Sequence, residues 1–315
     1  MVPGINVDYL AGDTLQQDIR SWLSPPDPWK NHNIAHGSRY NGTGEWFLHS
    51  DTLPEWKTAG PSSLLWIHGK RRLPLSAHSF AKTDVRPLSQ LAQERVCFGA
   101  LTPQYSLLEL TVLVSSAIIQ EIEVLRKSGL ASLAFYYHDF REDQKKDLRG
   151  LVSSVLFQLC DQSDSYYDIL LNFYSTHRRG AQHPSNDGLL RCLKDLLGLS
   201  GQAPVYLIID ALDECPNTST MPSPREEILM LVEQLVESQL MNLRLCVTSR
   251  PEIDIKIVLG PLAFHSISIH DESGQLEDIE NYIRSTVNTD QKNQRWKKED
   301  KELVIKALAE RADGM

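Results

Sequence analysis

Five short hydrophobic runs along the chain are typical of buried β-strands. Each run is six or seven residues long, and longer polar or amphipathic segments separate one run from the next. The run that ends at Asp210 is continuously apolar before the aspartate, which is the pattern of a strand covered on both faces. The predicted strands are Ser63–Gly69, Ser132–Tyr137, Val205–Asp210, Leu243–Ser249 and Phe264–Ile269.

Two segments between the predicted strands have the spacing of amphipathic helices. Apolar residues in the segment 148–159 recur every three or four positions and therefore share one helical face. A leucine stripe over 189–197 predicts another helix, with Asn186 or Asp187 as its N-terminal cap and Gly198 as its terminator.

A capping box begins a third predicted helix. Ser223 and Glu226 stand three residues apart, Pro224 occupies the first helical position, and the apolar stripe that follows runs from Ile228 to Leu235. Because helices alternate with strands, the sequence predicts an α/β fold in which helices flank a mainly parallel sheet. The other predicted helices are 15–23, 112–122, 275–285 and 298–312.

The segment 1–60 has the composition of a leader rather than of a hydrophobic core. The prolines from Pro25 onward end the helix predicted over 15–23, because proline supplies no N–H to a helix. A polar stretch follows, and we expect Trp46 and Trp56 to pin the leader to a neighbouring surface.

Charge and cysteine content narrow the class of protein. The 315 residues include 32 basic and 41 acidic ones, and the net charge of −9 argues against a nucleic-acid partner. The longest apolar-rich stretch, 107–119, contains Glu109 and is too short to span a bilayer, so no membrane span is expected. The five cysteines lack CxxC spacing and are expected to be buried thiols. Since the chain begins without a basic or apolar leader peptide, we expect a cytoplasmic location.

Three carboxylates lie within five residues of one another at the end of the third predicted strand. Asp210 ends this strand, at the edge of an α/β sheet where ligands bind, and Asp213 and Glu214 come directly after it. Because like charges this close repel one another, one interpretation is that Asp210 holds the Mg²⁺ of a nucleoside triphosphate. Asp213 or Glu214 would then orient and polarise the water that attacks the γ-phosphate. The alternative is a solvated acidic turn.

Arg250 is the second candidate for chemistry. It directly follows the strand that comes next in the sequence, and Pro251 restricts the chain behind it. An arginine in this position can fork onto a γ-phosphate. The alternative is a surface ion pair with the acidic residues. We expect Asp210 and Arg250 to lie on adjoining strands.

Seven strings carry a resemblance to a known family: Trp22–Asp27, Asn31–Ala35, Glu45–Leu48, Leu65–Lys70, Phe135–Phe140, Asp210–Cys215 and Val247–Pro251. Together they resemble the NACHT nucleoside-triphosphatase domain of fungal NOD-like, STAND-class proteins, in the variant with a nephrocystin-type N-terminal domain. The resemblance implies a three-layer P-loop NTPase sandwich with a mainly parallel sheet. It also implies a leader (1–60), an NTPase core (61–270) and the beginning of a helical lid (271–315).

The resemblance assigns roles to the acidic cluster and the arginine. Asp210 matches the Walker B aspartate that binds the metal, and Asp213 and Glu214 match its extended acidic partners. Arg250 matches the first sensor arginine. The implied catalytic residues are therefore Asp213, Glu214 and Arg250, and the implied cofactors are Mg²⁺ and ATP or GTP.

The Walker A phosphate loop is interrupted. Gly69 matches its first glycine and Thr111 its final Ser/Thr, a direct Mg²⁺ ligand, but the 40 residues 71–110 separate Lys70 from Thr111. One interpretation is retained intron sequence or a misplaced splice junction; another is a genuine insertion in a degenerate domain. A third is that Lys70 or the arginines after it replace the missing lysine. The implied nucleotide-binding residues are Gly69, Lys70, Thr111 and Ser249.

The function that the resemblance implies is an ATP- or GTP-dependent signalling switch that self-associates through its NTPase domain. The altered phosphate loop predicts impaired nucleotide binding, because consecutive N–H groups must converge on one anion. The alternative is a non-catalytic scaffold that keeps the fold. Since the family continues beyond Met315 into a winged-helix lid and repeats, the resemblance also implies that the chain is a fragment.

Overall fold

The computed structural model describes residues 7–38, 44–69, 110–269, 280–281, 284–285, 287–288 and 294–313 of the chain. Its centre is a five-stranded sheet with the order β2-β3-β4-β1-β5, in which every pairing is parallel. The strands are β1 (Ser63–His68), β2 (Ser132–Tyr137), β3 (Val205–Asp210), β4 (Leu243–Ser249) and β5 (His265–Ser268). All five lie where the hydrophobic runs predict strands.

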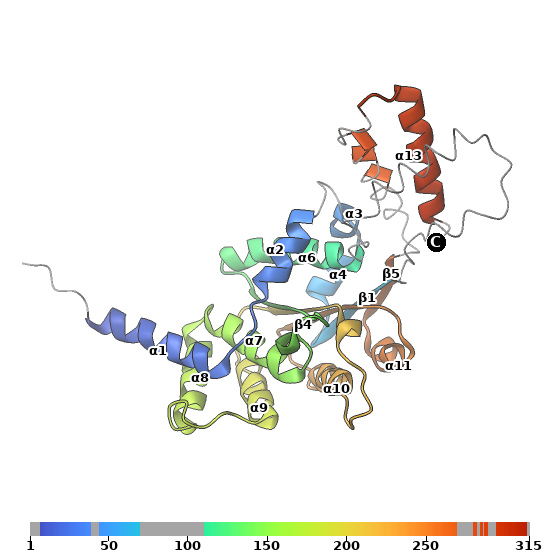
Figure 1. Cartoon of the computed structure of the whole chain (residues 1–315). Helices are drawn as coiled ribbons and strands as arrows, with labels where there is room; N and C mark the ends of the chain where they lie inside the picture. The colour runs from blue at the N-terminus through green and yellow to red at the C-terminus, as the bar shows by residue number, and fades with distance from the viewer. Residues whose placement is uncertain are drawn as a thin grey trace, which may run out of the picture.

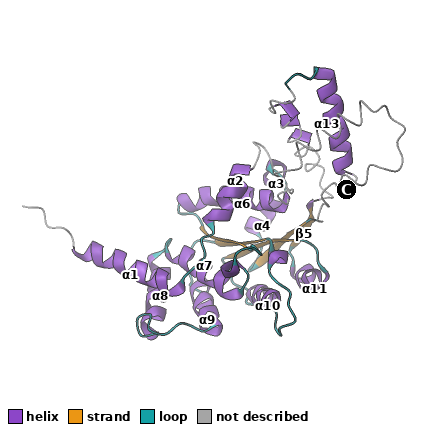
Figure 2. Cartoon of the chain, in the orientation of Figure 1, coloured by secondary structure: helices purple, strands orange, loops and turns teal. Residues whose placement is uncertain are grey.

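Helices cover both faces of the sheet, which gives three layers (Figures 1 and 2). One face carries α2 (Trp29–Ser38), α3 (Glu45–Leu48), α4 (Thr52–Thr58) and α6 (Leu110–Lys127). The other carries α7 (Leu148–Cys160), α9 (Asn186–Leu197), α10 (Pro224–Glu237) and α11 (Ile253–Leu262), and α8 (Asp164–Thr176) packs against α7 and α9. The predicted α/β sandwich is confirmed, and it is consistent with a P-loop NTPase.

The direction of each connection explains which face its helix covers. From β1 the chain passes through α6 to β2 at the far edge, and the connections from β2 to β3 and from β3 to β4 step back toward β1. Crossovers between parallel strands are right-handed, so connections that run in opposite directions place their helices on opposite faces. Therefore α6 lies on one side of the sheet and the helices from α7 to α10 lie on the other.

Strands β1 to β4 each contribute to two hydrophobic cores. Successive strand residues point to opposite faces, so Leu64 and Trp66 of β1 enter the core under α7, α9 and α10. Leu65 and Ile67 enter the core under α4 and α6. All four residues are 2% exposed or less, which explains why this strand is a continuous apolar run in the sequence.

The N-terminal segment takes part in these cores. Trp56 is fully buried, and its indole Nε1 donates to the carbonyls of Ser63 at 3.2 Å and Leu245 at 3.0 Å. Trp22 at the end of α1 (Val7–Leu23) is 5% exposed and packs edge-on against Tyr174. Trp56 therefore pins the segment to the sheet as expected, whereas Trp46 is only half-buried.

Some local predictions were wrong or incomplete. The cap of α9 is Ser185 rather than Asn186 or Asp187, because Ser185 Oγ accepts the N–H of Gly188 at 3.1 Å. Helices α2, α3, α4, α8 and α11 were not predicted. The sequence of α2 is polar and contains Gly37, and α11 contains Pro261 in its last turn.

Three further predictions concern the last helices, the cysteines and membrane spans. Helix α13 (Lys298–Asp313) matches the last predicted helix, whereas most of the helix predicted over 275–285 lies outside the described residues. Four cysteines are buried and free, and Cys97 lies outside the described residues. Within the described part of the chain, no helix has both the length and the apolar composition needed to cross a membrane.

Candidate functional site

The carboxyl ends of β1 and β4 meet where the chain leaves the sheet toward opposite faces. Helix α6, the next described helix after β1, covers one face, and α11, which follows β4, covers the other (Figure 1). Open α/β sheets bind ligands at such a switch point. The N–H of Gly69, just after β1, donates to the carbonyl of Ser249 in β4 at 3.3 Å. Asp210 and Arg250 follow at the ends of β3 and β4, which are paired neighbours as expected.

Asp210 is held at the end of β3 by a hydroxyl group from β4. The residue is 1% exposed, and its Oδ1 accepts a hydrogen bond of 2.7 Å from Thr248 Oγ1. The same hydroxyl oxygen accepts the N–H of Ala211 at 3.0 Å. Ala211 is left-handed, with φ of 55°, and turns the chain sharply out of the strand. Thr248 therefore fixes both the carboxylate and the turn that follows it.

Asp213 and Arg250 form a close pair beside this turn. Asp213 Oδ1 accepts the main-chain N–H of Arg250 at 2.9 Å, and Asp213 Oδ2 lies 3.2 Å from Arg250 Nε. The Asp213 side chain is 1% exposed, whereas the Arg250 side chain is 25% exposed. A guanidinium group of the protein thus balances the Asp213 carboxylate and still presents surface to solvent. The ion pair considered from the sequence is present, and it joins β4 to the acidic loop.

Arg225 was not predicted as a site residue. It binds both the acidic loop after β3 and the residues that follow Arg250 after β4. Its Nη2 donates to the carbonyl of Asp213 at 2.6 Å and its Nε to that of Cys215 at 2.9 Å. Its Nη1 pairs with Glu252 and with Asp254, both just after Arg250 in the chain. Arg225 is 6% exposed. Since it stands inside the capping box of α10, its sequence context indicated only a helix start.

Glu214 contacts the loop that follows β2. Glu214 Oε2 accepts the main-chain N–H of Phe140 at 3.3 Å. The neighbouring Asp139 is 3% exposed and is bound by both Nε and Nη2 of Arg141 at 2.8 Å. The hydrogen bond from Arg141 lowers the pKa of Asp139 to about 2. The loop is therefore ordered by an ionised carboxylate, and it contacts Glu214.

Helix α2 fastens the other side of this loop. Asn31 Nδ2 donates to Asp139 Oδ2 at 3.2 Å, and Asn31 Oδ1 accepts from Lys145 Nζ. Lys145, only 2% exposed, lies 3.3 Å from Glu142, which also pairs with Lys30 at 2.7 Å. These contacts attach α2 to the loop, and its buried residues His32 and Ala35 pack the helix against the fold, with His32 beside Phe135 of β2.

Two further side chains at the end of β2 are buried and titratable. Burial, followed by the charge of Asp210, raises the pKa of Tyr137 well above its ordinary value. The hydroxyl of Tyr137 lies 3.1 Å from Nδ1 of His32 in α2. His138 lies on the opposite face; its Nδ1 donates to the carbonyl of Lys145 at 3.0 Å, and burial lowers its pKa to about 4. Both side chains are therefore neutral at pH 7.

The remaining predicted residues have different surroundings. Ser249 is 1% exposed, and its Oγ accepts the indole N–H of Trp66 at 2.9 Å, so its hydroxyl serves packing. Thr111 is buried in the first turn of α6, one turn before Ser115, whose Oγ donates to the carbonyl of Val112 at 3.0 Å. Lys70 and the segment 71–109 lie outside the described residues.

Two of the predicted residues carry oxygen donors of the kind that Mg²⁺ takes at nucleotide sites. Within the described residues, no three carboxylate, histidine or cysteine side chains gather as a metal site. Mg²⁺ at nucleotide sites takes one or two protein oxygens and completes its octahedron with phosphate and water. The buried carboxylate of Asp210 and the hydroxyl of Thr111 are donors of that kind.

Residues 111–250 match the family described as nephrocystin 3, N-terminal, which is found in NACHT-type proteins. No curated protein matches the chain. The match begins at Thr111 and ends at Arg250, so it includes β2, β3 and β4 with the three acidic candidates. This chain is therefore similar to the nephrocystin 3 N-terminal family over the part that contains the acidic loop.

Proposed function

We propose that this protein is a nucleotide-dependent switch of the NACHT type, which binds Mg²⁺ with ATP or GTP at the carboxyl edge of its sheet. The observation that carries the proposal is the arrangement of Asp210, Asp213 and Arg250 on the paired ends of β3 and β4. This edge borders the switch point beside Gly69, where an α/β sheet of this topology binds its ligand.

The side chains at this edge have complementary roles in phosphoryl transfer. Asp210 and Thr111 would hold Mg²⁺, which when bound neutralises charge on the phosphate oxygens. Glu214 would orient the attacking water, since it lies beside the acidic loop and is only partly buried. Arg250, fixed by Asp213, would direct its partly exposed guanidinium toward the terminal phosphate.

Loss of the terminal phosphate would be transmitted through the loops after β3 and β4, which Arg225 joins. Arg225 binds the carbonyls of the acidic loop and also the carboxylates that follow Arg250, so a change in one loop would be passed to the other. Switches of this type convert a contact with the γ-phosphate into a change of loop order. The similarity to a family found in NACHT-type proteins favours a signalling role, with self-association through this domain and a cytoplasmic location.

The altered phosphate loop makes this nucleotide binding weak. The lysine that binds phosphate contributes a charge-assisted hydrogen bond worth about 1.5–3 kcal/mol. Leu110 occupies the position directly before Thr111 where that lysine is expected. Sequencing the messenger across the codons for Lys70–Val112 separates a splice fault, seen as a shorter form that encodes Gly and Lys before the threonine, from a genuine insertion.

The second candidate is a non-catalytic scaffold that keeps the fold. Ser249 favours it, because the hydroxyl assigned to nucleotide is engaged with Trp66 inside the core. Thermal unfolding of the full chain with Mg·ATP and Mg·GTP, beside Asp210→Ala, separates the candidates. Saturable stabilisation that needs Mg²⁺ and is lost in Asp210→Ala supports the switch. No stabilisation at millimolar nucleotide supports the scaffold.

A further inference from the structure

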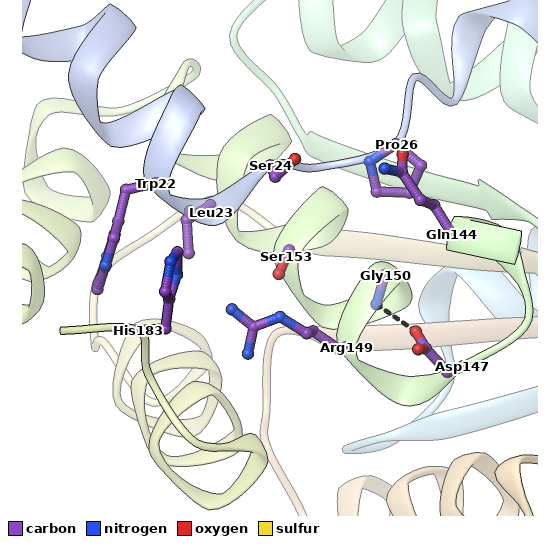
Figure 3. Close-up of a pocket in the computed structure, with 10 residues that line it drawn as sticks. All are labelled: Trp22, Leu23, Ser24, Pro26, Gln144, Asp147, Arg149, Gly150, Ser153 and His183. Carbon is purple, nitrogen blue, oxygen red and sulfur yellow. Dashed lines mark hydrogen bonds between the residues drawn. The ribbon is translucent and has the colours of Figure 1, made fainter. Parts of the chain in front are cut away.

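A cavity lies between the end of α1 and the start of α7. Its volume is about 330 Å³. Figure 3 shows the ten residues around it, which come from the α1 end, the linker behind it, the turn that contains Gln144, the start of α7 and the segment before α9. Trp22, Leu23 and Pro26 form an apolar wall, and the opposite wall is polar.

The polar wall contains a buried hydroxyl without a partner. Ser153 is 1% exposed, and its Oγ makes no hydrogen bond within the part of the chain that the structure describes. Figure 3 shows this hydroxyl directed toward the space between Leu23, His183 and Arg149. A buried hydroxyl left unsatisfied costs about 1–3 kcal/mol, which a ligand atom in this space would recover.

A cation stands beside this hydroxyl. Arg149 makes one hydrogen bond to the described residues, from Nη1 to the carbonyl of Pro184 at 2.8 Å, and pairs with no carboxylate among them. His183 lies next to it in the wall, and the indole of Trp22 holds that segment by donating to Gln182 at 2.8 Å.

The one carboxylate in the lining is already engaged. Asp147 caps α7 through its Oδ1, which accepts the N–H of Gly150 at 2.8 Å. Figure 3 shows Asp147 at the far end of the cavity from the Arg149 guanidinium. An anion is therefore attracted to the end with Arg149, His183 and Ser153, and is repelled from the other end.

We infer that this cavity binds a small anion, a carboxylate or a phosphate monoester, attached to an apolar group. The anionic group would bind Arg149 and accept from Ser153, and the apolar group would pack against Trp22 and Leu23. The site is separate from Asp210 and does not rest on the proposed function.

Isothermal titration of the full chain tests this site with four probes: phenyl phosphate, benzoate, inorganic phosphate and benzyl alcohol. We expect phenyl phosphate or benzoate to bind saturably, and the comparison between them identifies the preferred anion. Inorganic phosphate and benzyl alcohol should each bind at least about tenfold more weakly, because each lacks one half of the recognised chemistry. Asp210→Asn should bind the preferred probe like the wild type, which separates this cavity from the sheet edge.

Two variants locate the binding. Arg149→Met should weaken it about tenfold or more, whereas Arg191→Met, a matched arginine that bonds a main-chain carbonyl on α9, should not change it. Ser153→Ala should weaken binding without lowering the unfolding temperature, because its hydroxyl has no bond to lose. The inference is overturned if neither anionic probe binds at millimolar concentration, if Arg149→Met and Arg191→Met bind alike, or if inorganic phosphate binds as well as phenyl phosphate.

Discussion

Arg250 binds Asp213 twice, once through its main-chain N–H at 2.9 Å and once through its guanidinium Nε at 3.2 Å. The main-chain bond fixes the start of the loop after β4, and the side-chain contact balances a carboxylate that is almost fully buried. The arginine therefore serves the fold and, through its exposed surface, remains able to meet a ligand. These two roles can be separated by mutation.

Replacing Arg250 with methionine should lower the free energy of unfolding by about 2 kcal/mol, because Asp213 loses its balancing charge in a buried position. Denaturant unfolding measures this loss. Arg250→Met combined with Asp213→Asn should recover part of it, because no buried charge is then left alone. A double variant that is less stable than Arg250→Met by the full effect of Asp213→Asn would show that the two side chains act independently.

Thr248→Val keeps the shape of the side chain and removes the hydroxyl that joins Asp210 to Ala211. We expect a loss of about 1–3 kcal/mol in unfolding free energy, since a buried carboxylate and an N–H both lose a partner. Thr248→Ser should retain most of the stability. Equal stability of the valine and serine variants would contradict the role given to the hydroxyl.

Stability should fall with acid through His138. Its folded pKa, about 4, lies below the value near 6.5 expected when unfolded, so the unfolded chain takes up a proton first as the pH falls. The stabilisation is therefore complete above about pH 6.5 and is lost progressively toward pH 4, by up to about 3 kcal/mol. Unfolding free energies at a series of pH values measure this slope. His138→Phe should be less steep over the same range, and an identical slope would refute the assignment.

Trp56→Phe tests how firmly the N-terminal segment is attached to the sheet. The change removes an indole N–H that serves two main-chain carbonyls, and we expect a loss of about 1–3 kcal/mol in unfolding free energy. Trp46→Phe is the matched control, with a smaller expected loss because Trp46 is only half-buried. If the two variants lose the same stability, Trp56 does not have the anchoring role described above.

The strands and the acidic edge could be predicted because they depend on local pattern. A buried parallel strand is a continuous apolar run, and the ends of consecutive strands meet at one edge of the sheet. The residues that hold the acidic side chains in place at this edge could not be predicted, because their roles depend on tertiary contacts. Arg225 lies at the start of a helix and binds the loop that ends ten residues earlier. Thr248 lies within a predicted strand, where nothing in the sequence indicates that its hydroxyl binds Asp210.

Helix α2 could not be predicted from the sequence for the same reason. Its polar sequence has no apolar stripe, but Asn31 and Lys30 contact a loop more than a hundred residues away and His32 packs against Phe135 of β2. The cap of α9 was misplaced by one or two residues because serine, asparagine and aspartate stand together there and all suit a cap. Only the geometry of the Ser185 hydroxyl distinguishes them.

Equilibrium dialysis of labelled ATP against the full chain, with Mg²⁺ or with a chelator, tests the central claim most directly. The account predicts weak retention of nucleotide that needs Mg²⁺ and falls at least about tenfold in Asp210→Asn, while that variant remains folded. Retention that is the same in Asp210→Asn and in the wild type, or no retention at millimolar ATP, would contradict it.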